Sequence, residues 1–189
     1  QNIKEHILYD TDILPEYKAL IDIRGCQALS LNNLEWKRFR IGDLFNVNKG
    51  QRLTKAAQKE GNINYVGASA FNNGVTNHIG NNENLNSPNT ISVCYNGSIG
   101  EAFYQEETYW ATDDVNVLTP KFQINRYVAL FICTVIKNES IKFAFNNKWT
   151  KDIMEKSEIP LPVTHDGTPD YTFMQKYIMS LPYMQILDC

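Results

Sequence analysis

Three polar loops carry side chains whose types and spacing suit hydrogen bonding to a ligand. They are residues 48–55, 67–74 and 95–100, here called the first, second and third loops. Asn and Gln can bond the edge of adenine through two hydrogen bonds, and Arg or Lys can bond guanine. Alternatively, the Asn-rich steps simply make turns. The candidates for contacting bases are Gln51, Arg52, Ser69, Asn72, Asn73, Asn96 and Ser98.

Charge is distributed unevenly along the chain, although the net charge is only −3. Residues 37–59 carry seven Lys or Arg against one Asp, and residues 121–156 carry seven against three acidic residues. Residues 60–120 carry seven acidic residues and no Lys or Arg. The two basic blocks could fold into one positive face that fits an anionic polymer, or they could be ordinary solvated surface. The candidates for contacting phosphates are Lys37, Arg38, Lys49, Lys55, Lys148 and Lys151.

No pattern in the sequence supports catalysis, a cofactor or a bound metal. Asp113-Asp114 has no His or nucleophile near it in sequence and is more typical of a turn at a strand end. Neither a Walker-type loop nor the glycine-rich loop of a methyltransferase is present. The four cysteines are widely spaced and the three histidines are scattered, which argues against a zinc site and a disulfide framework. A reducing, cytoplasmic environment fits this cysteine usage.

Short apolar runs precede the three loops and predict the strands that position them: Phe45–Val47, Ile63–Val66 and Ile91–Cys94. Further strands are predicted over residues 36–41, 76–79, 101–105, 108–111 and 115–118, with a hairpin at residues 106–107. A scaffold of strands that presents polar loops on one side is a common basis for a recognition surface. We expect Phe71 and Trp149 to pack in the core, with a wedge beside a base as the alternative.

Helices are predicted where apolar residues recur with helical spacing or where a capping residue precedes such a run. The expected ranges are 15–23, 54–60, 125–137, 150–156 and 168–181. The last four helices have predicted N-terminal capping residues, which are, in the same order, Thr54, Asn125, Thr150 and Thr168. Two prolines make Ile159–Val163 extended. The predicted fold is mixed α+β, with a twisted, largely antiparallel sheet, flanking helices and a C-terminal helix.

Several short motifs follow one another in a fixed order. They are Trp36–Phe45, Lys49–Thr54, Tyr65–Ser69, Asn72–Val75, Ile91–Gly100, Ala111–Asp114, Lys148, Ile159–Val163, Asp166–Tyr171 and Tyr177–Ile178. In order and spacing, residues 35–183 resemble the target recognition domain of a type I restriction–modification DNA specificity subunit, or the equivalent domain of a single-chain restriction–methylation enzyme.

The resemblance implies a recognition domain over residues 36–165, preceded by a helical or connecting segment at 1–35. Residues 166–189 would begin a long helix that packs as a coiled coil and docks methyltransferase subunits. One such domain reads half of a bipartite DNA sequence, and a complete subunit carries two. The implied partners are therefore double-stranded DNA, a DNA methyltransferase subunit or domain, and a second recognition domain. Catalysis, S-adenosylmethionine and ATP use would belong to those partners.

We expect a non-catalytic module that binds double-stranded DNA sequence-specifically. The start at Gln1 fits a piece excised from a longer chain. One alternative is a protein-interaction module that docks a methyltransferase through the apolar stripe of its C-terminal helix: Tyr171, Met174, Ile178 and Leu181. Another is a carbohydrate-binding β module, against which the lack of a secretion signal counts. No apolar run approaches 18 residues, so no membrane-spanning helix is predicted.

Overall fold

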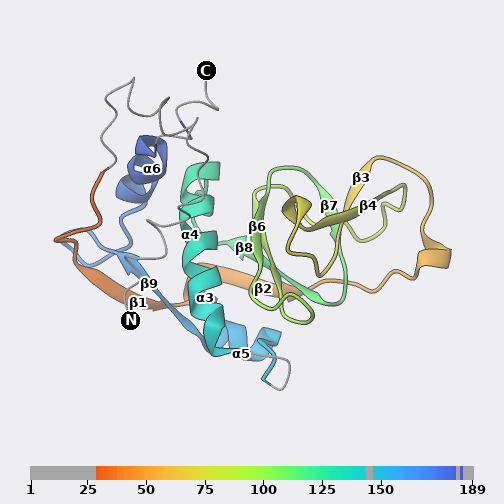
Figure 1. Cartoon of the computed structure of the whole chain (residues 1–189), viewed down its shortest axis with the longest axis horizontal. Helices are drawn as coiled ribbons and strands as arrows, with labels where there is room; N and C mark the ends of the chain where they lie inside the picture. Colours follow the sequence, from red (N-terminus) through yellow and green to blue (C-terminus); the bar gives the residue numbers. More distant parts are fainter. Residues whose placement is uncertain (1–28, 144–146, 182–183, 185–189) are drawn as a thin grey trace, which may run out of the picture. The chain divides into compact units, whose positions relative to one another are not determined.

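The structure is a computed structural model that describes residues 29–143, 147–181 and 184 (Figure 1). The chain divides into two compact units, one of residues Arg38–Ile159 and one of Gln1–Lys37 with Pro160–Cys189. The mixed α+β fold is confirmed, and the strands of the described residues are arranged in three sheets. The predicted helix at 15–23 lies outside the described residues.

A four-stranded antiparallel sheet forms the centre of the larger unit. Its strand order is β2-β8-β5-β6, with bounds β2 Phe45–Lys49, β5 Thr90–Cys94, β6 Ala102–Gln105 and β8 Val115–Pro120. All five residues of β5 are buried, because the strand lies between β6 and β8 inside the unit. This arrangement confirms the predicted strand before the third loop.

Helix α4 (Arg126–Glu139) packs against β6 of that sheet (Figure 1). Its predicted cap is confirmed, since the Oδ1 of Asn125 accepts hydrogen bonds from the amides of Tyr127 and Val128, both at 3.1 Å. The helix buries an apolar face that includes Ile132 and Ile136, each fully inaccessible to solvent. Burial of side chains of this size contributes about 1.5–3 kcal/mol each.

A three-stranded sheet, ordered β4-β3-β7, carries the second loop between β3 and β4, whereas the first loop follows β2 of the four-stranded sheet. The strands are β3 Ile63–Val66, β4 Val75–Ile79 and β7 Tyr109–Ala111, and β7 runs parallel to β3. The predicted hairpin at residues 106–107 is therefore wrong, because β6 pairs with β5 while β7 joins the other sheet. The fully buried Tyr109 is bonded there through its hydroxyl to Oγ1 of Thr90 at 3.0 Å.

Strands β1 (Trp36–Arg40) and β9 (Glu158–Pro162) form a two-stranded sheet. Both were predicted as extended segments, and the prolines of β9 are tolerated because both strands are edges. Helix α3 (Ile41–Leu44), a single turn, follows β1. Helix α5 (Lys151–Lys156) follows Thr150, but the side chain of Thr150 makes no capping bond, so that part of the prediction is wrong.

Three short 3₁₀ helices lie in the larger unit: η1 Lys55–Ala57, η2 Asn72–Gly74 and η3 Ser140–Lys142. The predicted helix at 54–60 is reduced to η1, and Thr54 makes no side-chain capping bond. Gln58 already has extended backbone angles, so the helix ends after one turn.

In the smaller unit, helix α6 (Tyr171–Ser180) begins later than predicted. Asp170, rather than Thr168, is its N-cap and accepts a hydrogen bond from the amide of Phe173 at 2.8 Å. Thr168 instead donates to the carboxylate of Asp166 at 2.8 Å within the preceding turn.

The apolar stripe of α6 does not face outward as a partner surface. Met174, Ile178 and Leu181 are 0%, 5% and 8% exposed, and Tyr171 is half-buried. Burial raises the pKa of Tyr171 to about 12. These side chains already pack within the chain, which counts against their assignment to a partner surface. Among the described residues, no helix is long and apolar enough to cross a membrane.

Candidate nucleic-acid interface

The first loop is fixed by its backbone against the end of β7. The amide of Gln51 donates to the carbonyl oxygen of Ala111 at 2.9 Å, and Nε1 of Trp110 donates to the carbonyl oxygen of Gln51 at 2.8 Å. A Cβ at Gly50 would lie 2.1 Å from the carbonyl oxygen of Thr112, so this approach requires glycine. The exposed side chain of Gln51 consequently extends from a fixed backbone.

The third loop is bonded to the turn formed by residues 112–114. The amide of Tyr95 donates to the carbonyl oxygen of Asp114 at 3.1 Å. The hydroxyl of Tyr95 donates to the carbonyl oxygen of Asp113 at 2.5 Å. Nδ2 of Asn96 donates to the carboxylate of Asp114 at 2.7 Å. The side chain of Asn96 is thereby held in one orientation.

The second loop contacts the third directly. The buried thiol of Cys94, just before the third loop, donates to the carbonyl oxygen of Gly67 at 3.7 Å. Gly97 has a positive φ of 77°, and a Cβ there would lie 3.1 Å from the Cβ of Ala68. The three loops therefore lie together beside the turn at 112–114, as expected of strands that present polar loops on one side. The turn adds the carboxylates of Asp113 and Asp114, so the expected positive face is not uniform at this point.

The first two loops and this turn border a hollow of about 570 Å³, which we call the first hollow. Arg52 and Lys55 bring positive charge to its wall, and Asp113 and Asp114 bring negative charge. The remaining polar lining includes the hydroxyls of Thr54, Thr76 and Thr112. A hollow with both kinds of charge can accept a ligand that presents both hydrogen-bond donors and acceptors.

The seven predicted base-contacting residues divide into two groups. Within the described part of the chain, the side chains of Gln51, Arg52 and Ser98 make no hydrogen bond or ion pair. The other four bond to the protein itself, as turn-forming side chains do. They are Ser69, Asn72, Asn73 and Asn96.

The second loop shows what those turn bonds achieve. Asn72 and Asn73 both adopt positive φ, at 52° and 53°, a conformation that asparagine tolerates. Nδ2 of Asn73 donates to the carbonyl oxygen of Tyr104 at 3.0 Å, and Nε2 of Gln105 donates back to the carbonyl oxygen of Asn73 at 3.0 Å. These bonds fix the second loop to β6, in accord with the turn interpretation.

The tip of the second loop presents an aromatic ring to solvent. Phe71 is 81% exposed, so the expectation that it packs in the core is wrong. Its amide donates to Oγ of Ser69 at 3.1 Å, which keeps the ring on a closed turn. Trp149, by contrast, is fully buried as expected and stacks on Phe143 with ring centroids 4.7 Å apart.

A second hollow, of about 590 Å³, lies beside strand β2 and joins the two basic blocks of the sequence. Arg40 comes from the first block, and Lys121 and Lys151 come from the second. Lys151 was among the predicted candidates for contacting phosphates, whereas Arg40 and Lys121 were not. Their position inside the two basic blocks was the signal that could have identified them.

The predicted phosphate-contacting lysines lie in several environments. Lys55 borders the first hollow and Lys151 the second. The exposed Lys49 lies over the ring of Tyr95, with Nζ 5.4 Å from its centroid, and interaction with that side chain raises the pKa of Lys49. Lys148 is half-buried in the larger unit. Lys37 belongs to the smaller unit, where it pairs with Glu35.

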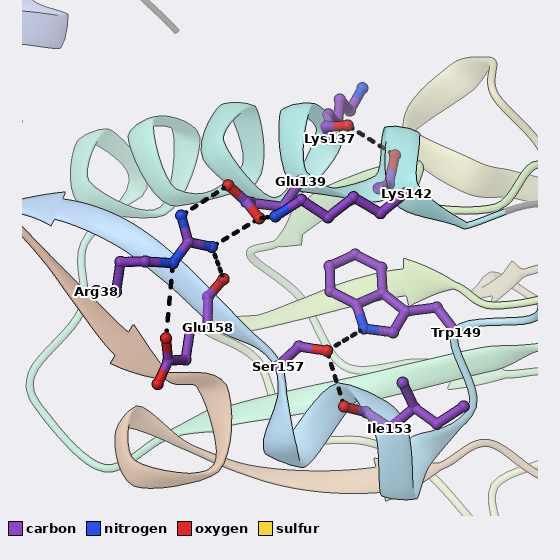
Figure 2. Close-up of polar contacts among 9 residues, drawn as sticks. Arg38, Lys137, Glu139, Lys142, Trp149, Ile153, Ser157 and Glu158 are labelled. Carbon is purple, nitrogen blue, oxygen red and sulfur yellow. Dashed lines mark hydrogen bonds and ion pairs between the residues drawn. The ribbon is translucent and has the colours of Figure 1, made fainter. Parts of the chain in front are cut away.

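Arg38 belongs to a group of paired charges, which we call the ion-pair cluster: Arg38, Glu139, Lys142 and Glu158 (Figure 2). The guanidinium donates to the carboxylate of Glu139 at 2.8 Å and to the carbonyl oxygen of Glu158 at 2.6 Å. Burial alone would raise the pKa of Glu139, but bonds from Arg38 and Lys142 outweigh it and lower the pKa. The guanidinium of Arg38 is thus occupied within the protein, which counts against a phosphate contact.

Burial raises the pKa of Cys94 to about 11, so its thiol is neutral at physiological pH and is a poor nucleophile. Among the described residues, no three His, Cys, Asp or Glu side chains are grouped to hold a metal ion.

Comparison with known proteins extends this description. Residues 33–182 match the Methylase_S family, described as the Type I restriction modification DNA specificity domain. The Type II restriction enzyme BgcI specificity subunit S.BcgI of Heyndrickxia coagulans is 39% identical over 178 residues, which are 92% of this chain and 52% of that protein. The chain therefore spans about half the length of that relative.

Solved structures share the fold. The crystal structure of the type I restriction–modification S subunit from M. genitalium superposes with a TM-score of 0.61 at 19% identity, over 95% of this chain and 44% of that one. The HsdS subunit from Thermoanaerobacter tengcongensis gives a TM-score of 0.58 at 15% identity, over 91% and 44%. At such identities the likeness concerns the fold alone.

Proposed function

Since this chain belongs to the Type I restriction modification DNA specificity domain family, we propose that it recognises one half of a bipartite duplex sequence. The observation that carries the proposal is the convergence of three loops on one turn. Their backbones are bonded to neighbouring strands, while the side chains of Gln51 and Arg52 have no bond among the described residues. Donors held ready on a fixed backbone suit the base edges of a major groove.

The second hollow supplies the contact to the DNA backbone in this proposal. Arg40, Lys121 and Lys151 bring three positive charges to one depression, against the carboxylates of Asp43 and Glu155. Phosphate contacts of this kind fix the register of a protein on the duplex without selecting a sequence. Lys49 and Lys55 add positive charge on the first loop itself.

The domain performs no catalysis in this proposal and acts with partners. A DNA methyltransferase subunit would supply the chemistry, and a second recognition domain would read the other half-site. The coverage of about half of the Heyndrickxia coagulans specificity subunit supports the half-site assignment. Burial of the α6 stripe leaves the protein-interaction alternative without its predicted contact surface.

Selection of bound sequences from a pool of random duplexes tests the proposal. The chain is used alone and together with the methyltransferase of its own system. We expect one recurring half-site, and binding that weakens steeply as salt is raised. Absence of any enriched sequence, combined with a tight methyltransferase complex, would contradict DNA recognition and favour the protein-interaction module.

A further inference from the structure

Two of the four charged side chains that line the first hollow are opposite in charge and do not pair with each other. Arg52 belongs to the first loop and Asp113 to the turn at 112–114. Within the described residues, neither side chain makes a hydrogen bond or an ion pair. Asp113 interacts electrostatically with Lys49, but only at long range, and Asp113 and Lys49 form no ion pair. Two charged groups that share a depression therefore both remain available to a ligand.

Hydrogen bonds fix the backbone around Asp113. The carbonyl oxygen of Asp113 accepts the hydroxyl of Tyr95 at 2.5 Å, and the amide of Thr112 donates to the carbonyl oxygen of Val66 at 3.0 Å. The neighbouring Asp114 is bonded to Asn96 at 2.7 Å. The two aspartates thus differ, because Asp114 orients a loop side chain and Asp113 keeps its acceptors unused.

A carboxylate at this point repels a phosphate, so the part of the first hollow beside Asp113 is poorly suited to the DNA backbone, although Lys55 borders the same hollow. It suits a ligand that offers acceptors to Arg52 and a donor to Asp113. In the major groove, guanine offers the acceptors O6 and N7, and its partner cytosine offers the N4 amino group as a donor. An A·T pair offers no second acceptor beside N7 on its purine, so it does not satisfy Arg52 in the same bidentate way.

We propose that Arg52 and Asp113 together read a single G·C base pair, with Arg52 donating to guanine and Asp113 accepting from N4 of cytosine. This inference rests on the proposed function and adds a specificity-determining residue to it. It also explains why acidic residues lie at the centre of a surface that binds a polyanion. The carboxylate selects against any base pair that lacks an amino group at that position.

The test compares four proteins in one selection from random duplexes: the unchanged chain, Arg52→Ala, Asp113→Ala and Glu107→Ala. Glu107 is the matched control, because it is an exposed carboxylate in the same acidic block and has no bond among the described residues. The side chain of Asp113 makes no hydrogen bond, so Asp113→Ala should fold, and its circular dichroism and thermal melting are recorded to verify this.

We expect Arg52→Ala and Asp113→Ala to relax the same single position, from G·C to any base pair. Each should lose about 5- to 150-fold of discrimination there, while Glu107→Ala retains it. Relaxation at two different positions, or at none, would overturn the pairing of Arg52 with Asp113 while leaving DNA recognition intact. Failure of the unchanged chain to enrich any sequence would overturn the proposed function and this inference together.

Discussion

The ion-pair cluster and the first hollow lie in the same unit and contain the same kinds of charged side chain. The charges of the cluster are paired with one another, whereas Arg52 and Asp113 in the hollow are not. In the cluster, the buried carboxylate of Glu139 receives bonds from Arg38 and Lys142 (Figure 2). In the first hollow, Arg52 and Asp113 make no such bonds among the described residues. Paired charges that are partly buried serve the fold, whereas charges held apart on fixed backbone remain available for a ligand.

The difference separates two arginines that look alike in sequence. Arg38 and Arg52 lie in the same basic block, and both were candidates for contacting DNA. Only the partner carboxylates of Arg38, which come from Glu139 and Glu158, distinguish them. Substitution of each arginine should therefore affect a different property, stability in one case and sequence preference in the other.

Arg38→Ala should produce the largest loss of stability. It leaves the buried carboxylate of Glu139 with Lys142 as its remaining ionic partner, which should cost about 2–3 kcal/mol of unfolding free energy. Urea unfolding measures this, with Arg40→Ala as the matched control on the same strand. If both variants lose the same small amount, the ion-pair cluster does not stabilise the fold.

Arg52→Ala should leave the unfolding free energy within about 0.5 kcal/mol of the unchanged chain, because its side chain makes no bond among the described residues. Its preference for the cognate duplex over a single-position mismatch should fall by about 1–3 kcal/mol. Competition binding with matched duplexes measures the preference. If Arg52→Ala is destabilised but keeps its preference for the cognate duplex, Arg52 has a structural role and does not contact a base.

The ion-pair cluster should also make stability depend on pH. The pKa of Glu139 is lowered in the folded chain from its ordinary value of 4.5. Its contribution is therefore fully present above about pH 4.5 and is lost as the pH falls through the folded-state pKa. Urea unfolding at pH 7 and at lower pH measures this, and the unfolding free energy of Glu139→Gln should depend less on pH than that of the unchanged chain. An unchanged dependence would assign acid sensitivity to other carboxylates.

Lys151→Ala tests the second hollow. Its ion pair with Glu155 is a surface contact at 3.7 Å, so stability should change little. Binding to every duplex should weaken alike, and the slope of log affinity against log salt should flatten by about one unit. Lys156→Ala, on the same helix but outside the hollow, is the control and should keep the full slope. Loss of affinity for one sequence only would contradict a phosphate contact.

Phe71→Ala should have the smallest effect on stability. The ring is 81% exposed, so its removal should change the unfolding free energy by less than about 0.5 kcal/mol. Thermal melting or urea unfolding checks this. A loss above about 1.5 kcal/mol would show that the ring packs after all, as its amino-acid type predicted.

Local patterns in the sequence predicted the elements whose causes are local. The cap at Asn125, the strand at Ile63–Val66 and the extended Ile159–Val163 depend on neighbouring residues and were confirmed. The pairing of β6 and β7 was predicted wrongly, since a turn signal at residues 106–107 does not identify the partner strand.

The sequence predicted which loops form the candidate site, but not the hydrogen-bond partners of their side chains. Glycine and asparagine marked the three loops, but the bonds of Asn73 to β6 and of Asn96 to Asp114 join residues that are distant in sequence. Arg38 and Glu139 are 101 positions apart, so their pairing was invisible in the basic block. Which side chains stay available for DNA depends on such distant partners.

Amide hydrogen exchange with and without a selected duplex tests the central claim most directly. Binding should protect the first, second and third loops and the turn at 112–114 together. Helix α4 is a core element and not part of the proposed surface, so it should exchange as before. Protection confined to other segments, with these loops unchanged, would contradict the claim that the converging loops form the DNA-binding surface.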